Sequence, residues 1–182
     1  MSRIPTPTTI DNAPAESREL LNAVNAKLGV VPNMFRLIGN SPAALEAYLS
    51  FGGALDNSSI DLATRERIAL TVAQVNGCDY CLAAHSYIGA NMAKLSAEEI
   101  DANRRGDSTD AKAAAAVSFA RKVASNRGQV SEGDIAAVKS AGYSDGAVVE
   151  IIALVALNLL TNYINTALET EVDFPEAVAL TA

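Results

Sequence analysis

The chain has no tryptophan, one histidine and two cysteines among its 182 residues. Aromatic residues make up only 5% of it, so we expect a core built from Ala, Leu, Val and Ile, a composition that favours closely packed helices. Basic runs are absent, and a net charge of −7 at pH 7 argues against a nucleic-acid-binding surface. With 49% hydrophobic residues, the chain is long enough to form one well-buried domain.

Signals for secretion or membrane insertion are also lacking. The first residues, Met1 to Pro7, contain no apolar segment of the kind that a secretory signal needs. The apolar run at residues 151–160 is too short to span a bilayer, which takes roughly 20 residues, and Glu150 and Asn158 interrupt its flanks. We therefore expect a cytoplasmic protein that binds no membrane, in which this run belongs to a buried core or interface helix.

The apolar pattern predicts an all-α fold. Helical spacing recurs along most of the chain, and no strand-type alternation persists anywhere. Pro5 and Pro7 predict that residues 1–13 form an extended arm. Residues 14–182 are predicted to form a single helical domain, which begins with a helix that Gly29 stops and ends with a long helix from about 144 to 169.

Capping residues divide the middle of this domain. Asp61 or Ser59 is expected to cap a helix that runs to position 75, and a second helix is expected to continue to about position 95. Ser96-x-x-Glu99 has the pattern of a capping box. Another helix, rich in alanine, is expected to start at Ser108 or Thr109.

The residues best suited to chemistry are concentrated at positions 76–85, where the sequence reads Asn-Gly-Cys-Asp-Tyr-Cys-Leu-Ala-Ala-His. The Asn-Gly pair predicts a break between helices, which places Cys78 in the first turn of a new helix. Cys78, Cys81 and His85 then fall on one stripe of that helix. Neighbours three apart have Cβ atoms roughly 5–6 Å from each other, so the sulfurs can reach disulfide geometry. The helix terminus favours a thiolate at Cys78, and His85 can accept the proton of Cys81.

Three interpretations of this group are compatible with the sequence. Redox chemistry is favoured because C-x-x-C in an intracellular chain is typical of thiols with a lowered pKa. A structural zinc site takes four ligands, of which Cys78, Cys81 and His85 supply three and Glu66 would be the fourth. A buried, inert pair of thiols is the third interpretation.

Two further residues bear on the same chemistry. Glu66 lies between Arg65 and Arg67, so a solvated ion pair is its simplest interpretation. The arginines point some 100° to either side of it on a helix, so neither need neutralise it. A Glu66 that faces the cysteine helix can orient His85 by accepting its second N–H. Tyr80 is expected to be a rim or core aromatic, because a pKa near 10 makes it a poor base at neutral pH.

Asn158, Thr161, Asn162 and Asn165 form a polar stripe inside the last, apolar helix. A buried amide needs hydrogen-bonding partners, so we expect these residues to bond across a helix pair, a subunit interface or the pocket. Asn158 and Asn162 are our candidate pocket or interface residues. After this helix, residues 171–176 are expected to form a polar exit from the domain.

Glu66, the twelve-residue step to Cys78, and the Cys-x-x-Cys-x-x-x-His pattern together resemble the AhpD-like alkylhydroperoxidases of the carboxymuconolactone decarboxylase family. The matching core covers about residues 60–90. The Asn-x-x-x-Asn stretch of the last helix and the Val172-Asp-Phe-Pro tail resemble the peroxidase-related branch of that family. The resemblance implies an all-α, oligomeric protein that reduces peroxides with its cysteine pair.

The resemblance also implies a role for each matching residue. Cys81 corresponds to the peroxidatic cysteine, Cys78 to the resolving cysteine, and Glu66 and His85 to a proton relay. Tyr80 departs from the best-known pattern, which has a second histidine there. The expected activity is reduction of a hydroperoxide, with an external dithiol as reductant, no cofactor and no metal, in a homotrimer or a multiple of it.

Two other classes of function remain open at this point. Decarboxylase members of the family act on a lactone acid, and this activity predicts an anion-binding arginine in the pocket and little dependence on thiols. A non-enzymatic redox sensor or zinc-binding interaction module would use the same cysteines without turnover.

Overall fold

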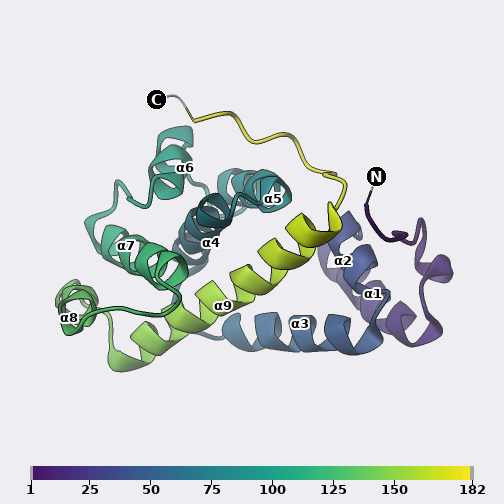
Figure 1. Cartoon of the computed structure of the whole chain (residues 1–182), viewed down its shortest axis with the longest axis horizontal. Coiled ribbons are helices and arrows are strands. Elements are labelled where there is room, and N and C mark those ends of the chain that lie inside the picture. Colours follow the sequence, from purple (N-terminus) through teal and green to yellow (C-terminus); the bar gives the residue numbers. More distant parts are fainter. Residues whose placement is uncertain (1, 181–182) are drawn as a thin grey trace.

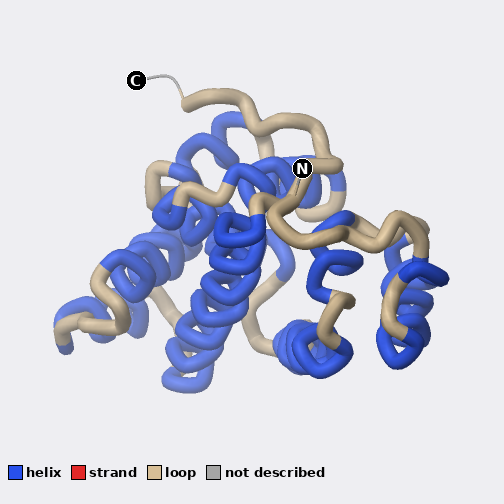
Figure 2. The backbone as a smooth tube through the Cα atoms, turned by 45° about the vertical axis from the view of Figure 1, so that its right-hand side comes forward, coloured by secondary structure: helices blue, strands red, loops and turns tan. Residues whose placement is uncertain are grey.

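The computed structural model describes residues 2–180, and within this range it contains nine α-helices, one 3-10 helix and no strand (Figure 2). The all-α prediction is therefore confirmed. In chain order the elements are η1 (Ile10–Asn12), α1 (Ala15–Leu28), α2 (Asn33–Ile38), α3 (Pro42–Leu55), α4 (Leu62–Asn76), α5 (Asp79–Asn91), α6 (Ala97–Arg104), α7 (Ala111–Ser125), α8 (Glu132–Ser140) and α9 (Asp145–Leu168).

Helix α4 is the centre of the fold and packs against α5, α6, α7 and α9. All its residues from Ile68 to Ala73 are buried, as expected for a helix that is apolar on nearly every side. Helix α9 crosses the molecule diagonally in front of α4 (Figure 1). Helix α3 lies along the lower edge of the molecule in this view. The arrangement places α5, which carries the cysteines, between α4 and the second half of α9.

The hydrophobic core has two parts. One part joins α4, α7 and the first half of α9 through residues such as Ile68, Phe119 and Ile151. The other part joins the first three helices to α5 and includes Leu45 together with Cys81. The cysteines therefore lie inside packed apolar structure and not on a surface loop.

Helix α9 is longer and more apolar than the run at residues 151–160 alone suggests. It has 24 residues and a mean hydropathy of 1.9 over an 18-residue window, so by length and composition it could cross a membrane. In the fold it packs against α3, α4, α5, α7 and α8 and buries Asn158, Asn162 and Asn165 together with apolar residues such as Ile151 and Leu154. Burial of polar and apolar residues against several neighbouring helices is the pattern of a core helix, one of the two places that the sequence predicted for this segment.

Several helix boundaries follow local capping rules. Asp61 caps α4 by accepting the backbone N–H of Thr64, Ser144 caps α9, and Gly29 ends α1 in a left-handed conformation with φ of 75°. The helix of the cysteines stops earlier than predicted, at Asn91, because the chain turns back so that the buried Leu95 packs against Gly89.

Two capping predictions near Glu99 are wrong for one reason. Ser96 does accept the Glu99 backbone N–H, but the Glu99 side chain turns away from Ser96 and leaves the capping box half formed. It binds instead the hydroxyl groups of Ser108 and Thr109. Because these hydroxyls are engaged, α7 is capped by Asp110, which accepts the backbone N–H of Ala113.

The N-terminal arm is not extended throughout. A single 3-10 turn covers Ile10–Asn12, and the following Ala13 is buried. Near its start, the backbone N–H of Arg3 donates to the carbonyl oxygen of Leu168 at 2.8 Å. The arm is therefore tied to the far end of the chain, beside the C-terminus of α9.

The tail after α9 is mostly exposed, as its polar composition predicts, but instead of leaving the domain it passes over α5 (Figure 1). Asp173 accepts the Tyr80 hydroxyl at 2.8 Å and the Asn33 backbone N–H at 2.7 Å. The ring of Phe174 packs edge-on against Tyr80, with centroids 5.8 Å apart, and lies 6.0 Å from the ring of Tyr87. These contacts cover the side of α5 that carries the tyrosines.

Candidate active site

Cys78 and Cys81 form a disulfide at the start of α5. Cys78 is the N-cap of α5, one position before the first turn in which the sequence placed it, and its sulfur accepts the Cys81 backbone N–H at 3.3 Å. The break before it is confirmed, since Gly77 ends α4 in a left-handed conformation with φ of 62°. With Cα atoms 5.3 Å apart and exposures of 1% and 3%, the sulfurs meet in a shielded position.

Glu66 and His85 are brought together from α4 and α5. Oε2 of Glu66 lies 2.8 Å from Nδ1 of His85, so the carboxylate faces the cysteine helix. The side chain of Glu66 is 11% exposed and that of His85 is 23% exposed. A carboxylate at Nδ1 fixes the tautomer of an imidazole and leaves Nε2 as the nitrogen that can take up a proton.

The arginines beside Glu66 do not neutralise it. Arg65 binds Asp56 at 2.7 Å, and Arg67 binds Glu99 at 2.6 Å. Within residues 2–180, His85 is the side chain that bonds to the Glu66 carboxylate. Because both flanking cations are committed elsewhere, this carboxylate can serve the histidine.

The polar stripe of α9 divides into residues with different roles. Asn158 donates to the carbonyl oxygen of Leu154 in its own helix, so this hydrogen bond is local to α9. Oδ1 of Asn162 accepts the Asn76 amide at 2.9 Å and so ties α9 to the end of α4. Asn165, which the sequence did not single out for the site, donates from Nδ2 to the sulfur of Cys81 at 3.3 Å. Its place in the stripe, three residues after Asn162, is the only signal in the sequence.

Tyr80 is a core aromatic, 4% exposed, on the tail side of α5. Its hydroxyl donates to Asp173 and accepts the Met34 backbone N–H at 3.2 Å. Burial raises the pKa of Tyr80 well above its usual value, and the charge of Asp173 adds to the shift. The residue that replaces the histidine of the best-known pattern therefore anchors the tail and stays protonated.

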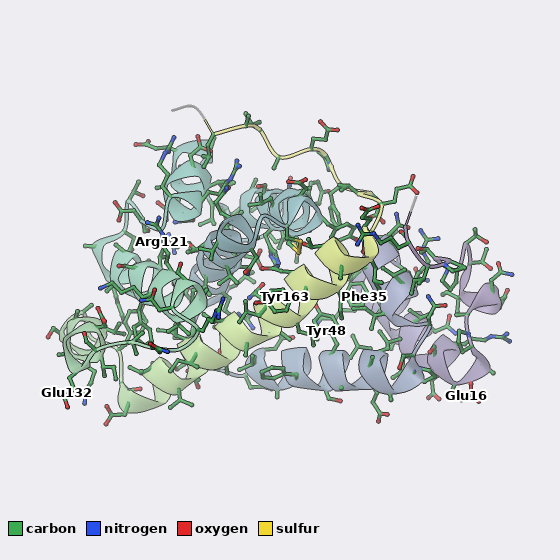
Figure 3. All side chains as sticks on the ribbon, viewed as in Figure 1. Glu16, Phe35, Tyr48, Arg121, Glu132 and Tyr163 are labelled. Atoms are coloured by element: carbon green, nitrogen blue, oxygen red, sulfur yellow. A yellow bond between two sulfur atoms is a disulfide. The ribbon has the colours of Figure 1, made fainter. Side chains whose placement is uncertain are left out.

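Tyr48 of α3 is a second residue that sequence reasoning missed. Figure 3 shows it in the region between α3 and α9, and its ring lies 5.7 Å from that of Phe35. Burial raises the pKa of Tyr48 to about 12, and the negative charge of Glu66 contributes to the shift. The phenol is therefore neutral at physiological pH and close enough to Glu66 to feel its charge.

Two cavities have linings that include neither cysteine. One, of about 370 Å³, is lined by the N-terminal ends of α4, α7 and α9 and includes Arg67 and Lys112. The other, of about 300 Å³, lies beneath the tail and includes Arg104. Arg104 is engaged there with Gln74 and with the carbonyl oxygen of Val178. Among residues 2–180, no group of three or more histidine, cysteine or acidic side chains is arranged to hold a metal ion.

Solved structures with the same fold come from several bacterial proteins. An uncharacterized peroxidase-related protein of Ralstonia eutropha JMP134, described as an alkylhydroperoxidase AhpD core, is 25% identical, with a TM-score of 0.84 over 94% of this chain and 92% of that one. A peroxidase-related protein of Silicibacter sp. TM1040 is 23% identical, with a TM-score of 0.81 over 93% and 91%. The debrominase Bmp8, solved with 2,3,4-tribromopyrrole, is 21% identical, with a TM-score of 0.79 over 95% and 94%.

The sequence comparisons are narrower. No curated protein matches the chain. The model of the carboxymuconolactone decarboxylase family matches residues 42–126, a range that contains Glu66, both cysteines and His85. Taken with the shared fold, this match makes the chain similar to the carboxymuconolactone decarboxylase family and to AhpD-like proteins.

Proposed function

We propose that this protein is a thiol peroxidase that reduces hydroperoxides through the Cys78–Cys81 pair. The observation that carries the proposal is that a C-x-x-C disulfide at the start of α5 lies on the same helix as His85, whose ring is bonded to the buried carboxylate of Glu66 on α4. Thiols that can close a disulfide, beside a group that accepts a proton, are what peroxide reduction requires.

The first step consumes the peroxide. His85, held by Glu66, takes the proton of the Cys81 thiol, and the thiolate attacks the terminal oxygen of the hydroperoxide. The S–O bond forms as the O–O bond breaks, which gives a sulfenic acid on Cys81 and an alkoxide. The alkoxide takes the proton from His85 and leaves as an alcohol, so the relay returns to its starting state.

The second step closes the cycle. The Cys78 thiol attacks the sulfur of the sulfenic acid, water leaves, and the Cys78–Cys81 disulfide forms. An external dithiol then reopens it by thiol–disulfide exchange and is itself oxidised to a disulfide. These steps need no cofactor and no metal, and the cytoplasm is the compartment we expect to supply the dithiol.

Self-association belongs to the same proposal. Large apolar side chains remain exposed on α9 and on α3, where Val149, Ile152, Tyr163 and Phe51 are 66%, 41%, 61% and 36% exposed. Apolar surface of this kind is typical of a subunit interface. We expect a trimer or a multiple of it, and a monomeric mass in sedimentation at micromolar concentration would contradict this.

Serine variants of the two cysteines test the proposed cycle. We expect Cys81→Ser to form no sulfenic acid with peroxide, and Cys78→Ser to form it once and then stop. The measurement is trapping with a sulfenic-acid reagent, together with turnover using a panel of dithiols. Stoichiometric oxidation of the wild type without turnover on any dithiol would favour a redox sensor, and stoichiometric zinc in the purified protein would favour a metal module.

A further inference from the structure

Asn165 is held against the reactive sulfur by the architecture of α9. It lies one turn before the end of that helix and is 3% exposed. Its carbonyl oxygen accepts the backbone N–H of Thr170 at 3.0 Å, where the chain leaves the helix. Nδ2 of the side chain is then 3.3 Å from the sulfur of Cys81 on α5.

The other end of this amide is unengaged. Oδ1 of Asn165 is buried and bonds to no group among residues 2–180. Its neighbour Asn162 differs, because Oδ1 of that residue accepts the Asn76 amide and fixes its orientation. Since nothing else holds the Asn165 amide, the charge on the sulfur decides which end faces it. In the structure the N–H end faces the disulfide sulfur of Cys81, and a thiolate at the same place would attract that end more strongly.

We propose that Asn165 is a further catalytic residue, whose Nδ2–H hydrogen bond stabilises the thiolate of Cys81 in the reduced protein. The bond matters most in that state, because a thiolate is a stronger acceptor than either a thiol or a disulfide sulfur. The proposal rests on the proposed function for the attack on peroxide. The stabilisation itself is a property of the sulfur and can be measured without peroxide.

The two cysteines are stabilised in different ways. The sulfur of Cys78 accepts a backbone N–H at the start of α5, a donor that does not depend on the identity of a side chain. The sulfur of Cys81 accepts instead from a side chain of another helix. In the proposed function, His85 is the proton acceptor four residues away. This makes Cys81 the sulfur whose reactivity is set by tertiary structure. The other titratable groups of the site, Glu66 and Tyr48, act alike on all variants of Asn165.

The test is the thiol pKa of Cys81 in the full chain with Cys78→Ser as background. The rate of alkylation by iodoacetamide, measured from pH 5 to pH 10 by mass spectrometry, gives this pKa directly. Asn165→Leu removes the donor at similar volume. Thr161→Val is the matched control, since Thr161 is buried on the same helix but its hydroxyl bonds within α9 to the carbonyl oxygen of Asn158.

We expect Asn165→Leu to raise the Cys81 pKa by about one unit or more, the effect of losing one hydrogen bond to a charged group, and Thr161→Val to leave it unchanged. At neutral pH, sulfenic acid formation should then fall roughly tenfold, in proportion to the thiolate lost. Asn165→Asp, which keeps the shape and adds a charge, should raise the pKa further and covers the case in which the leucine variant does not fold.

An unchanged Cys81 pKa in a folded Asn165→Leu or Asn165→Asp variant overturns the proposal. A raised pKa in a protein that shows no turnover with any peroxide upholds the role of Asn165 and contradicts the proposed function instead. An equal shift in Thr161→Val shows a general effect of α9 packing and also overturns it.

Discussion

Two buried glutamates, Glu66 and Glu99, have very different surroundings, one beside a histidine and the other among several hydrogen-bond donors. Glu66 is 8% exposed and Glu99 is 3% exposed. Among residues 2–180, the side chain that bonds to Glu66 is that of His85. Glu99 receives hydrogen bonds from Arg67, Asn103, Ser108 and Thr109, which between them engage both of its oxygens.

The difference lies in what each carboxylate can still do. The donors around Glu99 stabilise its charged form, so it acts as a fixed anion that joins α4, α6 and the start of α7. Although burial opposes ionisation, the hydrogen bonds from Ser108, Thr109 and Asn103 lower the pKa of Glu99 to about 2. Glu66 has a titratable partner, and a carboxylate–imidazole pair can pass a proton while its geometry stays fixed.

The largest expected effect is on the rate of sulfenic acid formation in the Glu66→Gln variant. Glu66→Gln should slow peroxide-dependent sulfenic acid formation at least about 100-fold, because a positioned acid–base group contributes that much or more. The change should leave the free energy of unfolding within about 1 kcal/mol, since the Gln amide can still bond to His85. Stopped-flow trapping and urea unfolding measure the two quantities. A variant that loses stability without losing rate would reverse the comparison with Glu99.

Glu99→Gln should behave in the opposite way. Removing the charge leaves Arg67 buried without its counter-ion, which costs about 3 kcal/mol of unfolding free energy. The rate per folded molecule should not change. Glu98→Gln is the matched control, because Glu98 is the preceding residue on α6 but is exposed, and it should alter stability by less than about 0.5 kcal/mol. Equal losses in the two variants would show that the hydrogen bonds of Glu99 contribute little.

The pH dependence of stability sharpens the same point. The pKa of Glu99 is lowered from 4.5 to about 2 in the folded state, so its contribution is fully present above about pH 4.5 and is lost as the pH falls toward 2. A shift of this size corresponds to about 3 kcal/mol. The stability difference between wild type and Glu99→Gln, from urea unfolding at several pH values, should therefore shrink below pH 4.5. A difference that stays constant to pH 3 would contradict the lowered pKa.

The sequence predicted what local rules determine. Gly29 gives the end of the first helix, and the stripe of Cys78, Cys81 and His85 follows from helical spacing alone. Predicting the contact between Glu66 and His85 needed one assumption, that Glu66 on its helix faces the helix of the cysteines. The structure brings the two side chains together. The Asn-Gly break makes this facing natural, because it folds α5 back against α4.

The features that sequence reasoning missed all join distant parts of the chain. The Asn165–Cys81 contact spans 84 positions, and the Tyr80–Asp173 hydrogen bond spans 93. Neither follows from spacing within one helix, because each depends on where a second element packs. Glu99 shows the converse, since a local capping pattern gave way to tertiary partners that offered a buried carboxylate more hydrogen bonds than its own helix end could.

The smallest expected effect concerns Arg65, the residue before Glu66. Its guanidinium binds Asp56, which also holds Lys27 at 3.0 Å, and hydrogen bonding to Lys27 is the first cause of the lowered pKa of Asp56. Because Lys27 remains and Asp56 is half exposed, Arg65→Gln should cost only about 0.5 kcal/mol of stability. The pH profile of peroxide reduction should be unchanged, since this charge is committed away from Glu66. If the acid side of this pH profile shifts in Arg65→Gln, the charge of Arg65 does act on Glu66. The difference in electrostatic surroundings between Glu66 and Glu99 would then be smaller than their hydrogen bonds indicate.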